Sequence, residues 1–279
     1  MIIDGKKISQ EIKDELKKEV EELKAQGIIL GLAVVAVGDD PASQVYIRNK
    51  ERACEYLGIK SFTHKLPANA PEEEVFGLIK NLNVDPNVQG ILVQLPLPEH
   101  LDPQKIIFAV KPEKDVDGFH PQNIGKTFSG ERALPPCTPA GIVELLKRCD
   151  IEIAGQHCVV VGRSNIVGKP LALMLLNESG TVTICHSKTK NLVEITKQAD
   201  ILICAVGRPN FITADMIKES VTLIDVGINH LADGALCGDI DFAGCETKAR
   251  AITPVPGGVG PMTIAMLMKN CVTAGKQQK

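Results

Sequence analysis

Apolar residues along the chain follow two alternating patterns, one typical of buried strands and one typical of amphipathic helices. From Ile8 to Ala25 they recur every three or four positions among glutamates and lysines, which predicts a helix with a charged outer face. Short β-branched runs instead predict buried strands. The predicted strands are 31–37, 62–66, 90–93, 158–161, 181–185, 200–207 and 221–227, and the other predicted helices are one from Pro41 onward, 71–82, 138–147, 171–176 and 262–268. This alternation predicts an α/β fold with parallel sheets, the last four strands forming a doubly wound one.

Composition narrows the class of protein. A length of 279 residues predicts about two domains. A net charge of −3 and only 3% aromatic residues argue against nucleic-acid binding. The start lacks the apolar segment of a signal peptide, and the longest apolar run, Ile28 to Val37, is too short to span a membrane. Nine scattered cysteines without a CxxC pair indicate reduced thiols in a cytoplasmic protein, with no disulfide frame and no metal site.

The glycine turn after the strand at 158–161 is the centre of the C-terminal half. Gly162 follows the strand, and an apolar helix pattern follows Gly168, as in the opening of a dinucleotide-binding unit. The match to GxGxxG is imperfect, because Ser164 replaces the second glycine and Gly168 comes one residue late. An ordinary strand–helix turn explains the pattern about equally well.

The end of the next strand indicates which nucleotide would bind. An NAD enzyme would carry an acidic residue near this point to hold the ribose 2′-hydroxyl. The chain has Ser187 and Lys188 there instead, with Arg163 in the first turn. Positive charge beside hydrogen-bond donors suits a 2′-phosphate and predicts NADP, with a solvated loop charge as the alternative for Lys188.

Polar residues of the N-terminal half fall where a ligand would bind in a parallel sheet. Tyr46 and Lys50 are four residues apart and share a helix face. Gln94 directly follows the strand at 90–93, and ligands bind beyond this edge of parallel sheets. Asp117 lies on a turn that could anchor ligand N–H groups. Each of these residues alone has an ordinary structural explanation, so the residues by themselves predict only an NADP-dependent oxidoreductase of unknown substrate.

Two further segments connect the halves. Pro135 to Pro139 indicates a linker, with Thr138 as the predicted N-cap of the following helix. The run from Pro256 to Gly260 is a glycine-rich loop that enters a helix. Such a loop brings backbone N–H groups close to a ligand, although a tight interdomain connector has the same sequence features.

Seven motifs in order along the chain resemble the bifunctional methylenetetrahydrofolate dehydrogenase/cyclohydrolase family, in its short bacterial two-activity type. In that family the late glycine is the usual form. The motifs are Tyr46-Ile-Arg-Asn-Lys50, Gly90-Ile-Leu-Val-Gln-Leu-Pro96, Lys114-Asp-Val-Asp-Gly118, Pro136-Cys-Thr-Pro139, Gly162-Arg-Ser-Asn-Ile-Val-Gly168, Cys185-His-Ser-Lys-Thr189 and Thr253-Pro-Val-Pro-Gly-Gly-Val-Gly-Pro261.

The resemblance implies two lobes with a cleft between them. A catalytic folate lobe would comprise 1–136 plus 262–279, and a Rossmann-type NADP lobe 137–261. It also implies a cytoplasmic homodimer that serves one-carbon metabolism and purine biosynthesis. The chain would oxidise 5,10-methylenetetrahydrofolate with NADP and hydrolyse the 5,10-methenyl product to 10-formyltetrahydrofolate. A dehydrogenase of another small substrate, such as an amino-acid or shikimate-type enzyme, and a non-catalytic NADP-binding regulator are the alternatives.

The resemblance also assigns residues. Lys50 would move protons in the hydrolysis, Gln94 would orient its amine, Tyr46 would pack on the folate, and Asp117 would accept hydrogen bonds from the pterin. The implied folate contacts are Tyr46, Lys50, Val93, Gln94, Leu95, Asp117, Pro256, Gly257, Gly258 and Gly260. The implied NADP contacts are Gly162, Arg163, Ser164, Gly168, Ser187 and Ile228. No metal ligand is expected.

Overall fold

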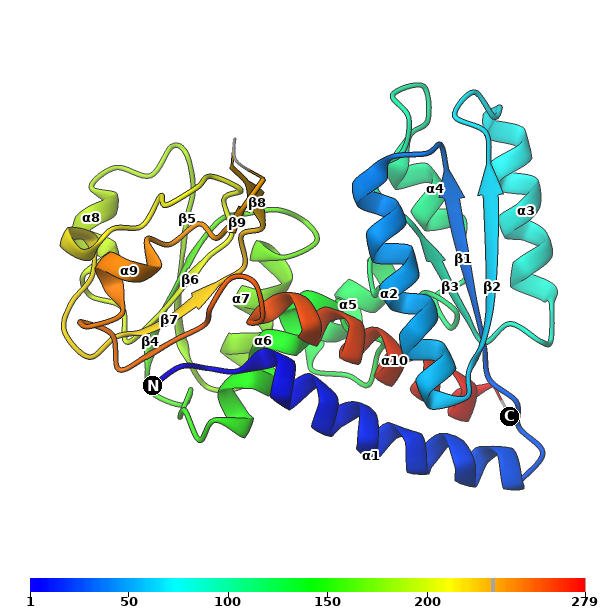
Figure 1. Cartoon of the computed structure of the whole chain (residues 1–279), viewed down its shortest axis with the longest axis horizontal. Coiled ribbons are helices and arrows are strands. Elements are labelled where there is room, and N and C mark those ends of the chain that lie inside the picture. Colours follow the sequence, from blue (N-terminus) through cyan, green and yellow to red (C-terminus); the bar gives the residue numbers. More distant parts are fainter. Residues whose placement is uncertain (232–233, 279) are drawn as a thin grey trace. The chain divides into compact units, whose positions relative to one another are not determined.

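The computed structural model describes residues 1–231 and 234–278, and it divides into two compact units (Figure 1). Each unit is built around its own parallel sheet. The three-stranded unit comprises Gln10–Cys137 and Ile264–Lys279, and the five-stranded unit comprises Met1–Ser9 and Thr138–Thr263. Strands alternate with helices in both, so the predicted α/β fold is confirmed.

The three-stranded unit has the strand order β2-β1-β3, with every pair parallel. Its strands are β1 (Gly31–Val37), β2 (Lys60–Leu66) and β3 (Gly90–Val93). Helix α2 (Pro41–Leu57) follows β1 and begins as predicted, because the Asp40 carboxylate accepts a hydrogen bond from the Ser43 N–H. It ends at Gly58, which takes the left-handed conformation that a helix C-terminus favours. Helix α3 (Glu72–Val84) then leads to β3.

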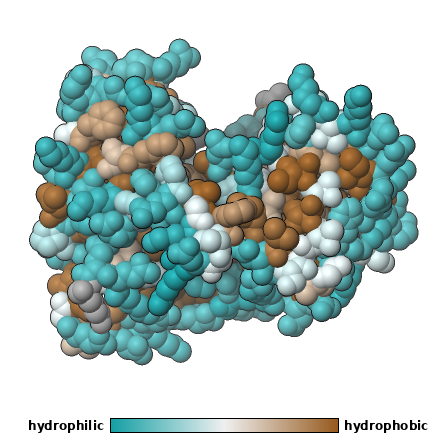
Figure 2. All heavy atoms as spheres, turned by 180° about the vertical axis from the view of Figure 1, so that it is seen from behind, coloured by the Kyte–Doolittle hydropathy of each residue, from teal (hydrophilic) through white to brown (hydrophobic). Residues whose placement is uncertain are grey.

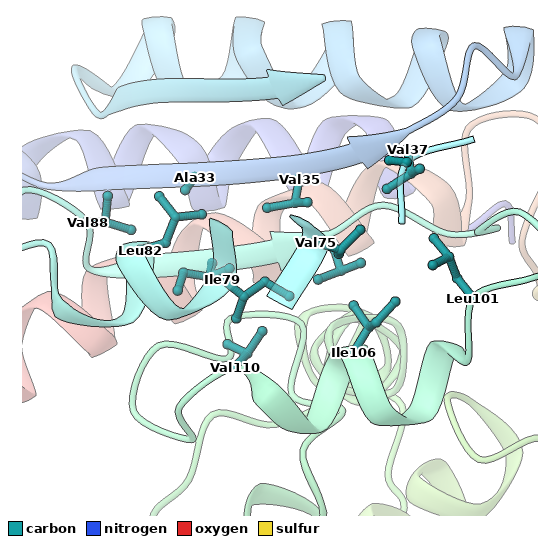
Figure 3. Packing of buried hydrophobic residues seen from close by; sticks show 13 residues of the cluster. Ala33, Val35, Val37, Val75, Ile79, Leu82, Val88, Leu101, Ile106 and Val110 are labelled. Carbon is teal, nitrogen blue, oxygen red and sulfur yellow. The ribbon is translucent and has the colours of Figure 1, made fainter. Parts of the chain in front are cut away.

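One face of this sheet carries a hydrophobic core, seen in Figure 3. Helix α3 contributes residues three or four positions apart, which therefore share one face, and α4 (Pro103–Ala109) contributes Ile106 to the same core. The labelled residues are Ala33, Val35 and Val37 of β1, Val75, Ile79 and Leu82 of α3, and Val88, Leu101, Ile106 and Val110. All are at least nine-tenths buried.

Besides α2 and α3, this unit contains α4, α5 (Pro121–Ser129) and most of α1 (Gly5–Ala25) and of α10 (Val259–Gln277). Helix α1 begins three residues before the predicted start, and the short helices α4 and α5 were not predicted. On α10, the Asn270 amide donates to the Val116 and Pro135 carbonyls at 2.9 and 2.8 Å. These bonds fasten the second segment of the unit to the first.

The five-stranded unit has the strand order β10-β7-β6-β4-β5, and all of these pairs are parallel. The strands are β4 (His157–Val161), β5 (Thr181–Cys185), β6 (Ile201–Cys204), β7 (Thr222–Asp225) and β10 (Ala251–Ile252). The chain runs outward from β4 to β5 and then returns to β6 on the other side of β4. The strand order therefore reverses between β4 and β6, which is where open parallel sheets bind ligands.

The connections in this unit are helices α6 (Cys137–Arg148), α7 (Gly168–Asn177), α8 (Leu192–Thr196) and α9 (Phe242–Cys245), a 3₁₀ turn at Ala214–Met216, and the antiparallel pair β8 (Asn229–His230) and β9 (Leu236–Cys237). Two predictions are corrected here. The strands predicted at 200–207 and 221–227 are shorter, because residues 205–207 and 226–227 leave the sheet as loops. Thr138 does not cap α6: it lies inside the helix, and its hydroxyl pairs with that of Thr263 at 3.0 Å.

The outer surface is mainly hydrophilic on the face shown in Figure 2, with separate hydrophobic patches. Among residues 1–231 and 234–278, no helix combines the length and the apolar character that crossing a membrane requires. The same residues contain no group of three or more His, Cys, Asp or Glu side chains arranged to hold a metal ion.

Candidate active site

Lys50 and Gln94 come together in the three-stranded unit. Lys50 lies on α2, the helix that follows β1, and Gln94 is the residue directly after β3. The Gln94 N–H donates to the Val35 carbonyl of β1, which continues the sheet pairing by one residue and fixes the glutamine at the strand end. The Lys50 Nζ donates to Gln94 Oε1 at 2.9 Å, and Gln94 Nε2 donates to the Leu95 carbonyl at 2.7 Å. The amide of Gln94 is therefore held at both ends, and it presents its oxygen to the amine.

The electrostatics around this pair favour a neutral amine. Burial lowers the pKa of Lys50, and the nearby Asp117 carboxylate opposes part of that shift. Burial raises the pKa of Asp117 to about 6, although the Lys50 charge counteracts this. Burial also raises the pKa of the Cys137 thiol well above its usual value. Lys50, Asp117 and Cys137 thus affect one another's pKa, and the net effect on the Lys50 amine is a lowered pKa.

A second carboxylate shapes the loop that carries Asp117. Asp115 is 3% exposed, and it accepts hydrogen bonds from the Phe119 and His120 N–H groups and from the Asn123 amide. Gly118 has a φ of +74°, and a Cβ there would lie 2.4 Å from the Pro135 carbonyl carbon, so only glycine fits. Sequence reasoning did not single out Asp115 or Cys137 as part of the site.

The remaining predicted folate residues of this unit differ in exposure. Tyr46 lies one helical turn before Lys50 and is 39% exposed, so its ring is open to a ligand. Leu95 is partly buried. Val93 is 5% exposed and belongs to the core cluster beneath the sheet, so it offers a ligand only its main chain.

A cavity of about 440 Å³ opens in the five-stranded unit at the carboxyl ends of β4, β5 and β6. It lies where the strand order reverses. Its lining residues are Val161, Gly162, Arg163, His186, Ser187, Thr189, Leu192, Ala205, Val206, Arg208 and Phe211. Of the predicted cofactor residues, Gly162, Arg163 and Ser187 line it.

The turn after β4 shows why the glycines are spaced as they are. A Cβ on Gly162 would lie 2.4 Å from the Ala205 carbonyl oxygen, and one on Gly168 would lie 2.2 Å from the Gly162 carbonyl oxygen. Ser164 Oγ accepts hydrogen bonds from the Val167 and Gly168 N–H groups at 3.1 and 3.3 Å. Ser164 thus closes the turn by its two hydrogen bonds, and Gly168 allows α7 to begin in direct contact with the main chain of that turn.

The cavity suits a phosphorylated dinucleotide. Arg163 and Arg208 supply positive charge, Ser187 and Thr189 supply hydroxyl groups, and none of the described lining residues is acidic. The Arg208 guanidinium lies 4.9 Å from the centre of the Phe211 ring. Lys188, which the sequence also indicated, is exposed and is not among the lining residues, so the solvated alternative describes it better. These residues fit NADP.

The glycine-rich loop before α10 belongs to the same unit. Lys6 N–H donates to the Gly257 carbonyl at 2.9 Å, and a Cβ on Gly5 would lie 1.9 Å from the Gly258 carbonyl oxygen. Gly257 has a φ of +108°. Ile228 is 43% exposed, and its Cδ1 would lie 3.7 Å from a Cβ on Gly260. The loop is therefore fixed by the first residues of the chain and enters α10 as predicted.

Comparison with known proteins covers the whole chain. The family model for the catalytic domain of tetrahydrofolate dehydrogenase/cyclohydrolase matches residues 3–117, and the model for its NAD(P)-binding domain matches residues 136–279. The bifunctional protein FolD of Lachnoclostridium phytofermentans is 60% identical over 277 residues, which are 99% of this chain and 98% of that protein.

Solved structures of the same family superpose on this chain. The bifunctional FolD methylenetetrahydrofolate dehydrogenase/cyclohydrolase of Campylobacter jejuni is 49% identical and superposes with a TM-score of 0.98, covering 100% of this chain and 99% of that one. The corresponding enzyme of Trypanosoma brucei, solved in complex with NADP cofactor and inhibitor, is 37% identical with a TM-score of 0.96, covering 100% and 98%.

Proposed function

The chain belongs to the tetrahydrofolate dehydrogenase/cyclohydrolase family, and we propose that the Lys50–Gln94 pair performs the proton transfer of its hydrolytic reaction. The protein is a bifunctional enzyme of one-carbon metabolism. It oxidises 5,10-methylenetetrahydrofolate to the 5,10-methenyl form with NADP and hydrolyses that product to 10-formyltetrahydrofolate. Family membership decides against the two alternatives, another dehydrogenase and a non-catalytic regulator.

The hydrogen bond of 2.9 Å between Lys50 Nζ and Gln94 Oε1 is the observation that carries the proposal. Hydrolysis begins with attack of water on the bridge carbon of the methenyl cation, and the water must lose a proton. The neutral Lys50 amine accepts that proton and returns it to the folate nitrogen that leaves the bridge carbon. Burial lowers the pKa of Lys50, and a bound cation would lower it further, so both effects favour the neutral amine that can accept a proton. Gln94 orients the amine lone pair by accepting one of its hydrogens.

Tyr46 and Asp117 are proposed to bind the folate. The exposed Tyr46 ring offers a flat apolar surface one turn from Lys50. With a pKa of about 6, Asp117 is ionised at neutral pH and accepts hydrogen bonds from the pterin amino and ring N–H groups. Binding of this kind aligns the methylene bridge, which is the main requirement of the oxidation.

The cavity beyond β4, β5 and β6 is proposed to hold NADP, which supplies the hydride acceptor when bound. Gly162 and Gly168 allow the turn after β4 and the start of α7 to pack closely on their own main chain. The N-terminus of α7 is assigned to the pyrophosphate. Arg163 and Ser187 are assigned to the 2′-phosphate, and Ser164 and Ile228 to the remaining contacts. The five-stranded unit, which includes residues 1–9, then acts as the nucleotide-binding domain, and the three-stranded unit acts as the folate-binding domain.

The enzyme is proposed to be a homodimer that works in the cytoplasm and supplies 10-formyltetrahydrofolate to purine biosynthesis. Strand β5 lies at the edge of its sheet, and Ile184 on it is 40% exposed. An exposed apolar edge strand is suited to pairing with another chain. Cys158, Cys185 and Cys204 lie as free thiols in the strands, which suits a reducing compartment.

An absorbance assay with 5,10-methylenetetrahydrofolate and NADP tests the function. The purified protein is expected to form NADPH and then to consume 5,10-methenyltetrahydrofolate faster than buffer does. A control with NADP and shikimate or amino acids should show no turnover. NADPH formation without faster methenyl consumption would limit the enzyme to its dehydrogenase activity and remove the proposed role of Lys50.

A further inference from the structure

Asp225 and Asp239 lie behind one wall of the nucleotide cavity, and neither belongs to the predicted site. Asp225 is the last residue of β7, and Asp239 lies two residues after the end of β9; both strands are labelled in Figure 1. Asp225 is 3% exposed and Asp239 is 0% exposed. A fully buried carboxylate is costly unless hydrogen bonds satisfy it, so the contacts of these two residues indicate what they hold in place.

Asp239 holds the loop that follows β6. Its Oδ2 accepts hydrogen bonds from the Val206 and Gly207 N–H groups at 2.6 and 2.9 Å. Its Oδ1 accepts from the Arg208 N–H at 2.9 Å and from the Asn229 amide at 3.0 Å. Four donors use the full acceptor capacity of an ionised carboxylate. Three of them are consecutive main-chain groups, and Val206 and Arg208 line the cavity.

Asp225 holds the main chain of Asp239 in turn. Its carboxylate accepts from the N–H groups of Gly227, Asp239 and Ile240 at 2.9, 2.8 and 2.8 Å. Burial raises its pKa to about 6, so it is ionised at neutral pH. The Asp225 carboxylate at the end of β7 thus holds the main chain of Asp239. The Asp239 carboxylate in turn holds the main chain of the cavity wall.

Glycines allow the main chain to approach both carboxylates. A Cβ on Gly227 would lie 2.3 Å from Asp239 Oδ1, and one on Gly238 would lie 1.9 Å from Asp225 Oδ2. Main-chain bonds from Asn210 to the Gly238 carbonyl (3.1 Å) and from Ile212 to the Asp239 carbonyl (2.9 Å) add to the attachment. The wall of the cavity is thus fastened over several residues to the segment around Asp239.

We propose that Asp239 is a positioning residue for NADP, which fixes residues 206–208 in their binding conformation before the nucleotide arrives. The inference rests on the proposed assignment of this cavity to NADP. A loop that is already ordered loses no further conformational entropy when a ligand binds. Losing the hydrogen bonds to Asp239 should therefore weaken the binding of NADP. Arg208 would be affected most, because Asp239 holds its N–H while its guanidinium lies against Phe211.

The variant Asp239→Asn tests the proposal. An amide has one acceptor oxygen, and its NH₂ group would face N–H donors, so at least two of the four bonds are lost. The affinity for NADP, measured by calorimetric titration of the purified enzyme, should fall roughly 10- to 100-fold. The KM for NADP should rise with it while the KM for the folate stays constant. Hydrolysis of 5,10-methenyltetrahydrofolate, which uses no NADP, should continue and report that the protein is folded.

Asp200→Asn is the matched control. Asp200 immediately precedes β6, at the opposite end of the strand from residues 206–208, and it accepts hydrogen bonds from the His157 N–H and from Lys218 Nζ. Its replacement should leave the affinity for NADP unchanged. Equal loss of NADP affinity in both variants, or parallel loss of folate turnover in Asp239→Asn, would reduce Asp239 to general stabilisation of the unit.

Hydrogen exchange of the unmodified protein tests the same point if Asp239→Asn fails to fold. The amides of residues 206–208 should exchange slowly without NADP, because the carboxylate already holds them. Fast exchange that becomes slow only with NADP would mean that the nucleotide orders the loop and would overturn the proposal. An unmodified enzyme that binds no NADP would instead overturn the cofactor site, whereas normal NADP binding by Asp239→Asn would overturn only this inference.

Discussion

Replacing Lys50 with methionine should separate the two reactions of the enzyme. Methionine is about as long as lysine and apolar, so α2 and the packing beside Tyr46 should be kept. The variant removes the proton-accepting amine and the donor to Gln94 Oε1. Hydride transfer needs alignment of donor and acceptor and no protein base, whereas hydrolysis needs a proton moved at the bridge carbon.

The expected size of the effect follows from the geometry. Losing a positioned acid–base group lowers a rate by about 10²–10⁴-fold, which corresponds to about 3–5.5 kcal/mol of activation free energy. Gln94 is 9% exposed, and its Oε1 would lose its donor, which costs about 1–3 kcal/mol of folding stability. For a domain of roughly 150–250 residues, each kcal/mol lowers Tm by about 2–4 °C. The variant should therefore remain folded at assay temperature.

The assay follows NADPH formation and methenyl consumption separately on one preparation, with uncatalysed hydrolysis subtracted. Methenyl product should accumulate while NADP-dependent oxidation continues. Lys65→Met is the matched control, because Lys65 Nζ donates to Gln44 Oε1 at 3.0 Å in the same unit but is exposed. It should retain both activities.

Two outcomes would refute the reasoning for Lys50. Parallel loss of both activities, with a raised folate KM, would make Lys50 a binding residue only. Hydrolysis at the normal rate would remove Lys50 from the mechanism and leave the proton transfer to another group.

Three further predictions concern the cofactor, the folate and the assembly. Arg163→Ala should weaken NADP by about 1.5–3 kcal/mol and NAD much less, since only NADP carries the 2′-phosphate, and equal losses in titrations with both would contradict that assignment. Asp117 has a raised pKa of about 6, so its ionised form appears as the pH rises through 6. The folate KM of the unmodified enzyme should therefore fall between pH 5 and 7, in both activities together. The folate KM of Asp117→Asn should be higher and should depend less on pH. Because the Asp117 pKa is higher in the folded protein than in the unfolded chain, the stabilisation present at low pH is lost as the pH rises from about 4 through 6, and Tm measured against pH should fall over that interval. Ile184→Lys should convert a dimer into monomers in light scattering, and an unchanged mass would exclude the β5 edge as the interface.

The sequence allowed prediction of most of the framework, because its elements carry local signals. Asp40 before Pro41 predicted the start of α2 correctly. The same signal stands at Asp102 and Pro103, where the Asp102 carboxylate caps α4, but the helix has only seven residues and too little periodicity to be recognised. Strand 200–207 was predicted too long, because Ala205 and Val206 continue the apolar pattern although they line the cavity.

The site was predictable only in part, because its partners meet through the tertiary fold. Strand-end rules placed Gln94 at the lip of the sheet, but its bond to Lys50 joins residues 44 positions apart. Asp239 gave no signal at all: in the sequence it is a polar residue between Gly238 and Ile240. Its burial depends on the loops of two parallel strands closing over one carboxylate.

The division of the three-stranded unit into two chain segments constrains how the protein is made. Synthesis on the ribosome completes residues 10–137 first, then the whole of the five-stranded unit, and only then residues 264–279. Until that last segment has been synthesised, the hydrogen bonds from the Asn270 amide to the carbonyls of Val116 and Pro135 cannot form. The loop of Asp117 lies within the segment that these bonds fasten. The three-stranded unit of the nascent chain is therefore finished last, after the five-stranded unit.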